Sequence, residues 1–486
     1  MRVYGIIKKR DFKRKTKAVM NNRQESIDFY KKVFTLALPI AFQSFITIGV
    51  NMLDTMMVGS LGDDALTATS LANSFISVFQ ILCMGLGMGA SVLVSRYWGM
   101  KQSGMQDEQS KSAGRALKQT VCLMLRLNIT LAGIFAILTW LIPDIIMSTY
   151  SEKSHIITLG VRYFNYSVVT YFFVGLSLVI TIVLRSIGEV LYPLVISIGA
   201  FVVNLCMNYV LIFGEFGFPK MGVAGAALGT LCARVFEFIF IFGYLVLHDK
   251  KIGFRIKDLF MKTGSLISEY IRICIPVLIS DGILAVGTNA VAMVIGHLEG
   301  SIAPANAITS VTQQLSTVVI QGVSQAGAIV TGITLGEGSR EKTMKHGYRF
   351  FKLGIILGLI SAAFIVIFSD AIIGFYKDVT PETARTAKDL MNAISLIIVF
   401  QGTNSIMTKG VLRGGGDTKM LMLTDNIFLW ALAIPLGIIA GFWLKLPAFW
   451  IYICLKSDQI VKTFWAFLRL RSGKWIKKIT TGKAPK

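Results

Sequence analysis

The sequence has few charged residues. Charged side chains make up 16% of the chain and hydrophobic ones 54%, with a mean hydropathy of +0.64. Soluble globular domains carry about 25% charged residues, and a single soluble core stops growing well before the 486 residues present here. These proportions exclude a soluble globular protein and indicate an integral membrane protein.

Residues that bind metals or form catalytic centres are also scarce. The four histidines lie far apart, outside any His-Glu-x-x-His motif, and the six cysteines occur singly without paired spacing. No Walker A motif is present, so the chain alone cannot couple ATP hydrolysis to movement. We therefore predict that the protein is not an enzyme, has no cofactor or structural metal, and uses its cysteines for packing rather than for disulfides.

Long apolar runs are abundant, and each is long enough to cross ~30 Å of hydrocarbon. About twelve transmembrane helices are predicted, at 33–58, 69–95, 119–142, 160–184, 190–213, 222–247, 269–295, 305–333, 350–369, 387–409, 419–442 and 447–468.

The net charge of +22 would suit a nucleic-acid-binding protein, but the positive residues do not form one patch. Residues 1–32 hold eleven Lys or Arg against three acids, and residues 469–486 hold seven against none. Alternate loops are basic, as the positive-inside rule requires. The predicted inner loops, around 96–118, 248–272 and 335–352, are rich in Lys and Arg. Of the predicted outer loops, those at 59–68 and 296–304 have no Lys or Arg, and the one at 370–386 holds Lys377 and Arg385. We predict a multi-pass protein of the cell membrane with both termini cytoplasmic. Its partner is the lipid bilayer, and no nucleic acid is expected.

Two copies of one pattern divide the chain in half. One constant shift along the sequence superimposes Pro39 on Pro276, Gly59 on Gly296, Leu61 on Leu298, Gly85 on Gly322 and Gly99 on Gly336. A slightly shorter shift superimposes Val183–Glu189 on Val411–Asp417. Six helices per copy return the chain to the same side, so the halves are parallel.

The predicted fold is all-α, with about twelve transmembrane helices in two parallel, pseudo-symmetric six-helix lobes. The predicted parts are a basic cytoplasmic segment (1–32), an N-terminal lobe (33–247), a cytoplasmic linker (248–268), a C-terminal lobe (269–468) and a basic cytoplasmic tail (469–486).

Short motifs along almost the whole chain resemble one known family. They are Leu36–Ile40 and Asp54–Gly59 at the two ends of the first helix, Leu-Arg-x-x-Gly-Glu/Asp turns at 184–189 and 412–417, Ile308–Gln314, and Arg469–Trp475. Together they resemble the multidrug and toxic compound extrusion (MATE) transporters. The resemblance implies a secondary active antiporter that exports amphipathic, cationic organic compounds in exchange for Na⁺ or H⁺.

Asp54 is the leading candidate for ion coupling. A carboxylate at membrane depth costs roughly +2.5 to +3.5 kcal/mol on insertion scales, so it needs a functional or structural reason. Asn204 and Asn208 lie four residues apart, on one face of a helix. The resemblance assigns cation binding to Asp54, Asn204, Asn208 and Thr230, with interhelical hydrogen bonding as the alternative. Some relatives carry a second acid at position 208, so this chain offers one carboxylate, and the sequence does not choose between Na⁺ at Asp54 and a proton.

The second lobe offers weaker candidates. Asp281 lies five residues after Pro276, about one helical turn from the position of the acid in many relatives, which is Leu284 here. We predict either a cavity-lining or a structural role for it, and the same pair of roles for the polar residues Gln313, Gln314, Gln321, Gln325 and Asn404.

The remaining intramembrane charges and the first proline have structural interpretations. Arg234 with Glu237, and Asp458 with Lys462, are spaced to neutralise each other locally, whereas Asp425 has no local partner. Pro39 removes a backbone hydrogen bond and is predicted either to kink the first helix or to be tolerated near its start.

We therefore predict an alternating-access antiporter that works as a monomer. The alternative is a lipid-linked saccharide flippase, because such proteins can share this architecture, but a flippase should carry a cationic cavity for phosphate. Few intramembrane Arg and Lys are available for such a cavity.

Overall fold

The computed structural model describes residues 2–103, 107–298, 301–374 and 380–477, without the side chains of residues 2–22, 107 and 265. Every regular element in these ranges is a helix. The first half contains α1 (Arg2–Gly59), α2 (Asp63–Gln102), α3 (Asp107–Leu141), α4 (Pro143–Ser148), α5 (Ser154–Ser167), α6 (Thr170–Ser186), α7 (Leu191–Phe213), α8 (Val223–Gly243) and η1 (Tyr244–His248). A short helix follows, η2 (Ile256–Phe260).

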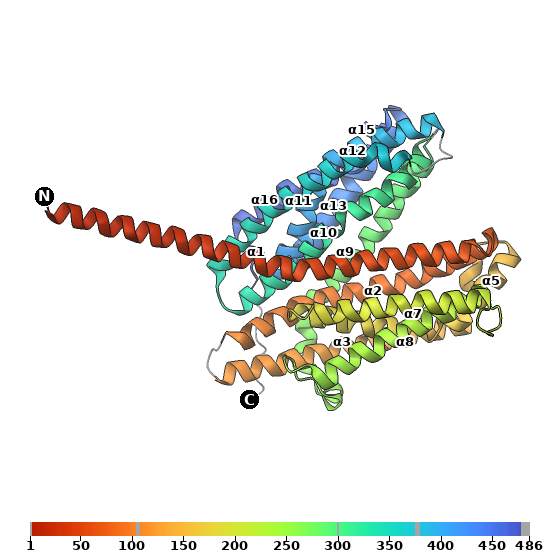
Figure 1. Cartoon of the computed structure of the whole chain (residues 1–486), viewed down its shortest axis with the longest axis horizontal. Helices are drawn as coiled ribbons and strands as arrows, with labels where there is room; N and C mark the ends of the chain where they lie inside the picture. The colour runs from red at the N-terminus through yellow and green to blue at the C-terminus, as the bar shows by residue number, and fades with distance from the viewer. Residues whose placement is uncertain (1, 104–106, 299–300, 375–379, 478–486) are drawn as a thin grey trace.

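The second half contains α9 (Gly264–Gly296), α10 (Ile302–Gly336), α11 (Arg340–Gly374), α12 (Pro381–Ser405), η3 (Ile406–Leu412), α13 (Thr418–Phe428), η4 (Leu429–Ala433), α14 (Ile434–Ile438), η5 (Ile439–Trp443), α15 (Ala448–Leu455) and α16 (Ser457–Ser472). Figure 1 shows two helical groups, one formed by the first half and one by the second, which lie together at one end and diverge toward the other. The predicted all-α fold of two lobes is confirmed. The exact lobe boundaries stay a prediction.

Most of the membrane spans predicted from hydropathy are single helices in the structure. Within the described ranges, ten helices are long and apolar enough to span a membrane, or eleven if the bent pair α5 and α6 forms one span. The predicted span at 160–184 is therefore bent, by 58°. The predicted span at 447–468 is also not one helix, because non-helical backbone at Lys456 separates α15 from α16.

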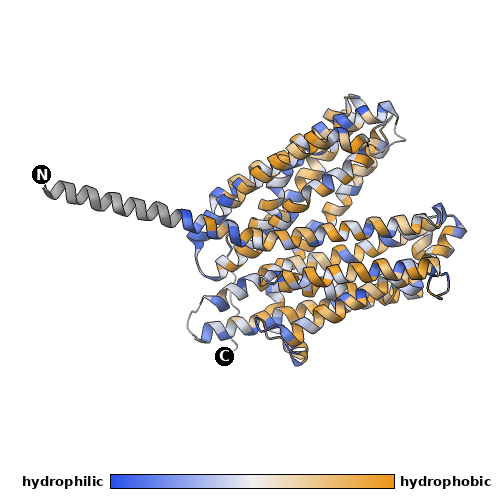
Figure 2. Ribbon diagram, viewed as in Figure 1, coloured by the Kyte–Doolittle hydropathy of each residue, from blue (hydrophilic) through white to orange (hydrophobic). Residues whose placement is uncertain are grey.

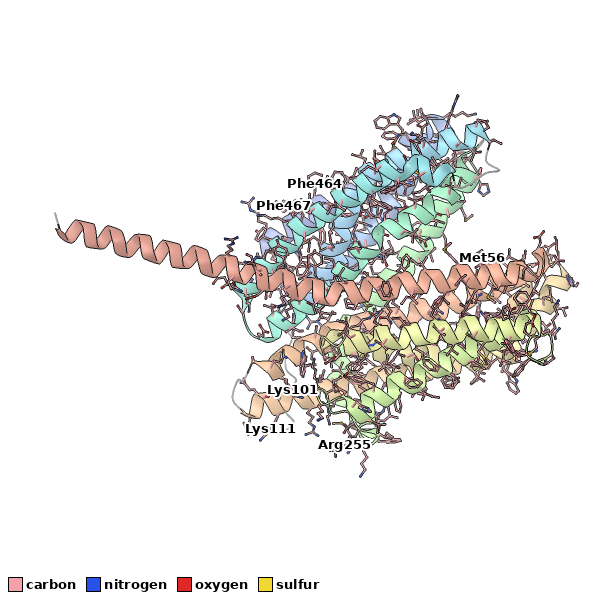
Figure 3. The ribbon with its side chains drawn as sticks, viewed as in Figure 1. Met56, Lys101, Lys111, Arg255, Phe464 and Phe467 are labelled. Atoms are coloured by element: carbon pink, nitrogen blue, oxygen red, sulfur yellow. The ribbon has the colours of Figure 1, made fainter. Side chains whose placement is uncertain are left out.

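The two ends of the bundle differ in charge. Lys101, Lys111 and Arg255 lie near the end where α1 enters the bundle, and Met56 lies near the opposite end (Figure 3). We call these the basic end and the far end. Between them the helices are predominantly apolar (Figure 2), and exposed aromatic side chains such as Phe464 cover the outer surface. This distribution suits a protein whose middle is surrounded by lipid. The six cysteines are free thiols.

The sequence repeat is visible in the contacts between helices. α1 packs against α10 and α7, and its counterpart α9 packs against α2 and α13, which are the counterparts of α10 and α7. In finer detail, Gly85 faces Leu278, and Gly322 faces Ala41. Each of these pairs maps onto the other under the shift that relates the two halves of the sequence. The two lobes are therefore related by a pseudo-twofold axis, and α1 and α9 each pack against one helix of their own lobe and one of the opposite lobe.

Glycines allow α2 and α10 to cross at the basic end. A side chain at Gly99 would collide with the Ile333 carbonyl, and one at Gly336 with the Arg96 carbonyl. These two glycines are again related by the repeat. Their missing Cβ atoms let two backbones touch, which brings the lobes together at this point.

Polar contacts reinforce the junction between the lobes at the basic end. The Tyr97 hydroxyl donates to the Glu269 carboxylate at 3.0 Å, and the buried Arg96 guanidinium donates to the Gly415 carbonyl at 3.2 Å and the Lys477 carbonyl at 2.8 Å. These bonds join α2 to α9, to the turn before α13 and to the segment after α16.

The segment between the lobes is fixed to α3. Lys118 forms an ion pair with Asp258 of η2 at 3.0 Å. Partial burial alone would raise the pKa of Asp258, but hydrogen bonds from the Arg255 N–H and from Lys118, with their positive charges, outweigh it and hold this pKa below its ordinary value.

Candidate functional site

Asp54 lies five residues before the end of α1, in the half of the membrane nearest the far end. Its Oδ1 atom accepts a hydrogen bond from Asn208 Nδ2 at 2.6 Å, and Asn204 Oδ1 accepts from the same nitrogen at 3.4 Å. Both asparagines are buried, whereas Asp54 is half-buried. Their spacing of four residues puts them on one face of α7, as predicted. The structure thus brings three of the four predicted coupling residues together.

Thr230 lies beside this cluster on α8 rather than within it. The preceding residue, Gly229, is the contact point: any side chain there would collide with Asn208 Oδ1. In the described part of the chain, no hydrogen bond links the half-buried Thr230 to the cluster, and the buried Asn208 Oδ1 has no donor. The site therefore holds a carboxylate and two amide oxygens, one of which is unsatisfied.

Further groups near Asp54 were not predicted from the sequence. Arg234 and Tyr163 are close enough to act on the Asp54 carboxylate electrostatically, and the Tyr163 hydroxyl donates to Asn73 Oδ1 at 3.2 Å. Arg234 also pairs with Glu237 at 2.7 Å, which confirms the predicted local pair. Tyr163 is remote from Asp54 in the chain, and no local pattern marks their proximity.

In the second lobe, Asp281 is held by an arginine. Arg413 donates to its two carboxylate oxygens at 2.9 Å and 3.3 Å. The Arg413 side chain is buried, and that of Asp281 is 21% exposed. Of the two roles predicted for Asp281, this geometry provides the structural one, an ion pair between α9 and the end of η3. Whether Asp281 also lines a cavity stays a prediction.

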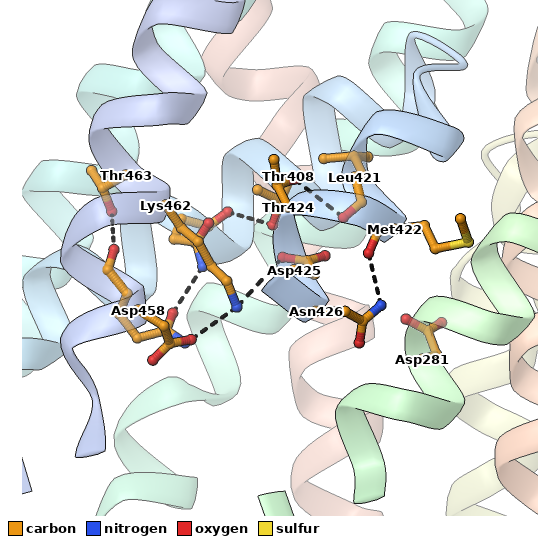
Figure 4. A network of polar contacts seen from close by, with 12 residues as sticks. Asp281, Thr408, Leu421, Met422, Thr424, Asp425, Asn426, Asp458, Lys462 and Thr463 are labelled. Carbon is orange, nitrogen blue, oxygen red and sulfur yellow. Dashed lines mark hydrogen bonds and ion pairs between the residues drawn. The ribbon is translucent and has the colours of Figure 1, made fainter. Parts of the chain in front are cut away.

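A second group of buried charges lies between α13 and α16 (Figure 4). Lys462 contacts Asp458 at 2.8 Å, as predicted, and Asp425 at 3.7 Å. Asp425 thus has a partner on another helix, although the sequence offered none nearby. Gln459 donates to Asp458 at 2.8 Å and accepts from Asn404 at 2.8 Å, so Asn404 is bound into this network.

The predicted glutamines of α10 occupy different surroundings. Gln313 is bonded within the second lobe, to Gln401 at 2.8 Å and to the Tyr452 hydroxyl at 3.1 Å. Gln314 and Gln321 are exposed and two turns apart, hence on one side of the helix. Exposed amides at this depth suit an aqueous surface better than lipid. Gln325 bonds to Arg185 of the first lobe at 2.7 Å.

Pro39 lies deep within α1, which begins at Arg2 and continues past the proline to Gly59. The alternative that Pro39 is tolerated near a helix start is therefore wrong. Its role as a kink stays a prediction.

The fold and these buried polar sites define a polytopic helical membrane transporter of two parallel lobes. A family model described as MatE matches residues 39–210 and 266–439. The chain belongs to this family, as the resemblance to the MATE transporters predicted.

Individual relatives agree with this assignment. The chain is 26% identical over 445 residues to the probable multidrug resistance protein NorM of Mesorhizobium japonicum, covering 89% of this chain and 91% of the relative. It is 25% identical over 431 residues to multidrug resistance protein PmpM of Pseudomonas aeruginosa, covering 86% and 85%. A solved structure described as the outward-facing conformation of a multidrug resistance MATE family transporter superimposes with a TM-score of 0.80 at 18% identity, over 91% of this chain and 96% of that one. These matches indicate a multidrug efflux transporter with the MATE fold.

Proposed function

We propose that the protein is a secondary active antiporter that exports amphipathic, cationic drugs and toxins in exchange for Na⁺ or H⁺. The observation that carries the proposal is the cluster of Asp54 with Asn208 and Asn204 inside the first lobe. A carboxylate at membrane depth is costly unless a cation or proton neutralises it. Neutralisation that alternates between the two sides of the membrane is what an ion-driven exporter requires.

The cluster suits either coupling ion. Na⁺ prefers oxygen ligands, and the Asp54 carboxylate with the amide oxygens of Asn204 and Asn208 would supply three. Rotation of the Asn208 amide would bring its unsatisfied Oδ1 toward the ion. A proton needs only the Asp54 carboxylate, with Asn208 as its hydrogen-bond partner. Exchange of one coupling ion for one monovalent cationic substrate moves no net charge, so the concentration gradient of the ion drives it, and each further positive charge that enters through 100 mV adds about 2.3 kcal/mol.

The arrangement of the lobes supports alternating access. The helices lie together at the basic end and diverge toward the far end (Figure 1). From the positive-inside rule we infer that the basic end is cytoplasmic, and the same rule predicts cytoplasmic termini. In this orientation the two helical groups diverge toward the outside of the cell membrane (Figure 1). In this scheme residues 33–247 and 269–468 move as the two lobes, residues 248–268 link them, and one chain suffices for transport. Gln314 and Gln321, which are both exposed, would line the route that opens between the lobes.

The flippase alternative has less support. A cationic cavity for phosphate would need several unpaired positive charges, but Arg234, Arg413 and Lys462 each face an acid, and Arg185 is the exception, with only amide partners among the described residues.

Reconstituted vesicles test the antiporter. The purified protein is placed in liposomes loaded with a fluorescent organic cation, and dye movement is followed under an imposed Na⁺ or pH gradient. We expect gradient-driven transport by the wild type and its loss in Asp54→Asn, whereas Asp144→Asn, a matched change at an acid outside this cluster, should behave as wild type. Transport that ignores both gradients, or that survives Asp54→Asn unchanged, would refute the proposal.

A further inference from the structure

A cavity at the basic end lies between α1 and the helices that join the lobes. Its volume is about 410 Å³. The apolar part of its lining is Leu36 of α1, Ile187 after α6 and Ile333 of α10. Ile333 is the residue whose carbonyl Gly99 approaches at the crossing of α2 and α10. The cavity therefore lies at the junction of the lobes, away from the Asp54 cluster.

The polar part of the lining is rich in hydrogen-bond donors. It consists of Lys31, Lys32 and Thr35 of α1, Trp98 and Gln102 of α2, and one acid, Asp28. Asp28 accepts a hydrogen bond from Gln24 at 3.2 Å. Among the described residues, neither lysine lies within ion-pair distance of an acid, and the Trp98 indole N–H has no acceptor. Two ammonium groups against one carboxylate leave the cavity with a net positive charge.

Trp98 is a fixed wall of this cavity rather than a surface side chain. It is 7% exposed. Lys101 and Lys251 lie over its ring, with Nζ atoms 5.5 Å and 6.0 Å from the ring centroid. Lys251 is itself paired with Glu189 at 2.5 Å, and Lys101 donates to the Lys251 carbonyl at 2.5 Å. These contacts hold the indole in place, so its N–H is a preorganised donor beside the two lysines of α1.

An exposed apolar stripe of α1 begins where the cavity ends. Lys31 and Thr35, which line the cavity, are followed by Leu38, Phe42 and Phe45 at intervals of three and four residues, so all five lie along one side of the helix. The three apolar side chains are 51–54% exposed, and the rings of Phe42 and Phe45 stack with 6.4 Å between their centroids. The axial rise from Lys31 to Phe45 is about 21 Å, enough to span one leaflet of a ~30 Å hydrocarbon core.

The stripe faces lipid rather than the route between the lobes. Ala41 touches Gly322 of α10, and Gln43 donates to Ser197 of α7 at 2.5 Å. Phe42 lies between these two residues in the sequence, and successive residues of a helix are turned by about 100°. Phe42 therefore points away from both helices that α1 packs against.

A cationic cavity that continues into an apolar stripe matches the two parts of a phospholipid. The phosphate carries a negative charge and accepts hydrogen bonds from ammonium and N–H donors. Basic pockets between transmembrane helices on the cytoplasmic side bind anionic headgroups, and the positive-inside rule assigns the basic end to the cytoplasm. A free phosphate ion would use the cavity but not the stripe.

We propose that this cavity binds the phosphate of an anionic phospholipid from the cytoplasmic leaflet, with an acyl chain along the stripe of Leu38, Phe42 and Phe45. Lys31 and Lys32 would neutralise the phosphate. Trp98 would donate to it through the indole N–H. Because α10 belongs to the second lobe and the rest of the lining to the first, the lipid would contact both lobes where they meet. Binding at this site does not depend on the proposed export function.

Lipid binding to the purified full-length protein tests the proposal. The protein in detergent is titrated with dioleoyl phosphatidylglycerol, and bound lipid is counted by native mass spectrometry. Dioleoyl phosphatidylcholine is the uncharged comparison, and inorganic phosphate is added as a competitor. The cavity variants are Lys31→Gln/Lys32→Gln and Trp98→Phe, which keeps an aromatic ring and removes the N–H. Lys111→Gln/Lys257→Gln is the matched control, because it removes two exposed positive charges outside the cavity.

We expect the Kd of phosphatidylglycerol to rise about tenfold or more in Lys31→Gln/Lys32→Gln, through the loss of two charges beside the headgroup. It should rise about fivefold in Trp98→Phe, through the loss of one hydrogen bond to a charged group. The control should match wild type, phosphatidylcholine should bind more weakly than phosphatidylglycerol to the wild type, and millimolar phosphate should not displace the lipid.

Three results would overturn the inference. Unchanged binding in both cavity variants would show that the lipid binds elsewhere. An equal loss in Lys111→Gln/Lys257→Gln would show a general attraction of the basic end for anionic lipid. Displacement by inorganic phosphate would assign the cavity to a free anion. Lys31 and Lys32 are exposed, so their variant should keep the wild-type melting temperature, and it decides alone if Trp98→Phe does not fold.

Discussion

The pair of Asp281 and Arg413 shows what a buried charge requires. Arg413 is 5% exposed at its side chain and has a bidentate partner. We expect Asp281→Asn to lower the free energy of unfolding by about 3 kcal/mol, because it leaves a buried guanidinium unpaired. Denaturant unfolding in detergent measures this.

The double variant Asp281→Asn/Arg413→Gln supplies the control. The double variant should lose less free energy of unfolding than the sum of the two single variants. Each single change leaves one buried charge unpaired, and the double change removes both charges. Additive losses would show that the two side chains do not stabilise each other.

For single residues, the sequence alone predicted which polar side chains share one face of a helix. The family resemblance was needed to predict which of these side chains meet between different helices. Asn204 and Asn208 share a face through their spacing alone, whereas their partnership with Asp54 came from the family. Arg413 lies 132 residues from Asp281. No local pattern encodes such a contact, because it depends on how α9 packs against α13. The repeat did align Arg185 with Arg413, and comparison of their partners needed the structure.

Among the helices, the crossing of α2 and α10 is the most constrained. A valine at Gly99 would collide with the Ile333 backbone, which cannot move away as a flexible side chain could. We expect Gly99→Val to part the lobes at the basic end, at a cost of about 1–3 kcal/mol for this closed arrangement. Distances between spin labels at Lys111 and Lys345, on a background without native cysteines, should lengthen.

Gly133→Val is the matched control for this crossing. It introduces the same side chain into α3, where no atom lies within 4 Å of the new Cβ. The label distance should stay at its wild-type value in this variant. An unchanged distance in Gly99→Val as well would contradict the tight crossing.

Hydropathy predicted where helices cross the membrane but not where they break. It reports the free energy of transfer of a segment, which is the same for a straight and a bent helix. The 58° bend between α5 and α6 and the interruption at Lys456 depend on backbone geometry set by neighbouring helices. Proline positions did not predict the helix breaks either, because α1 and α9 continue through Pro39 and Pro276.

For the molecule as a whole, alternating access requires the lobes to separate where they now meet. Cysteines at positions 85 and 278 would have Cβ atoms 3.6 Å apart, within the range for a disulfide. We expect Gly85→Cys/Leu278→Cys, on a background without native cysteines, to lose transport on oxidation and regain it with reductant. Each single cysteine variant should be indifferent to oxidant. Full transport by the cross-linked protein would contradict separation at this contact.

The contact between α1 and α10 of the opposite lobe is a point about which α1 can tilt. Ala41 touches Gly322, and Gly59, at the end of α1, lies about 27 Å further along the helix. A tilt of about 20° around this fulcrum would carry the tip through roughly 9 Å. Asp54 lies between Ala41 and this tip, five residues from the end of α1. Small adjustments where Ala41 meets Gly322 are therefore magnified at the ion site, and a change of a few ångströms at that site needs only a slight rearrangement at this contact.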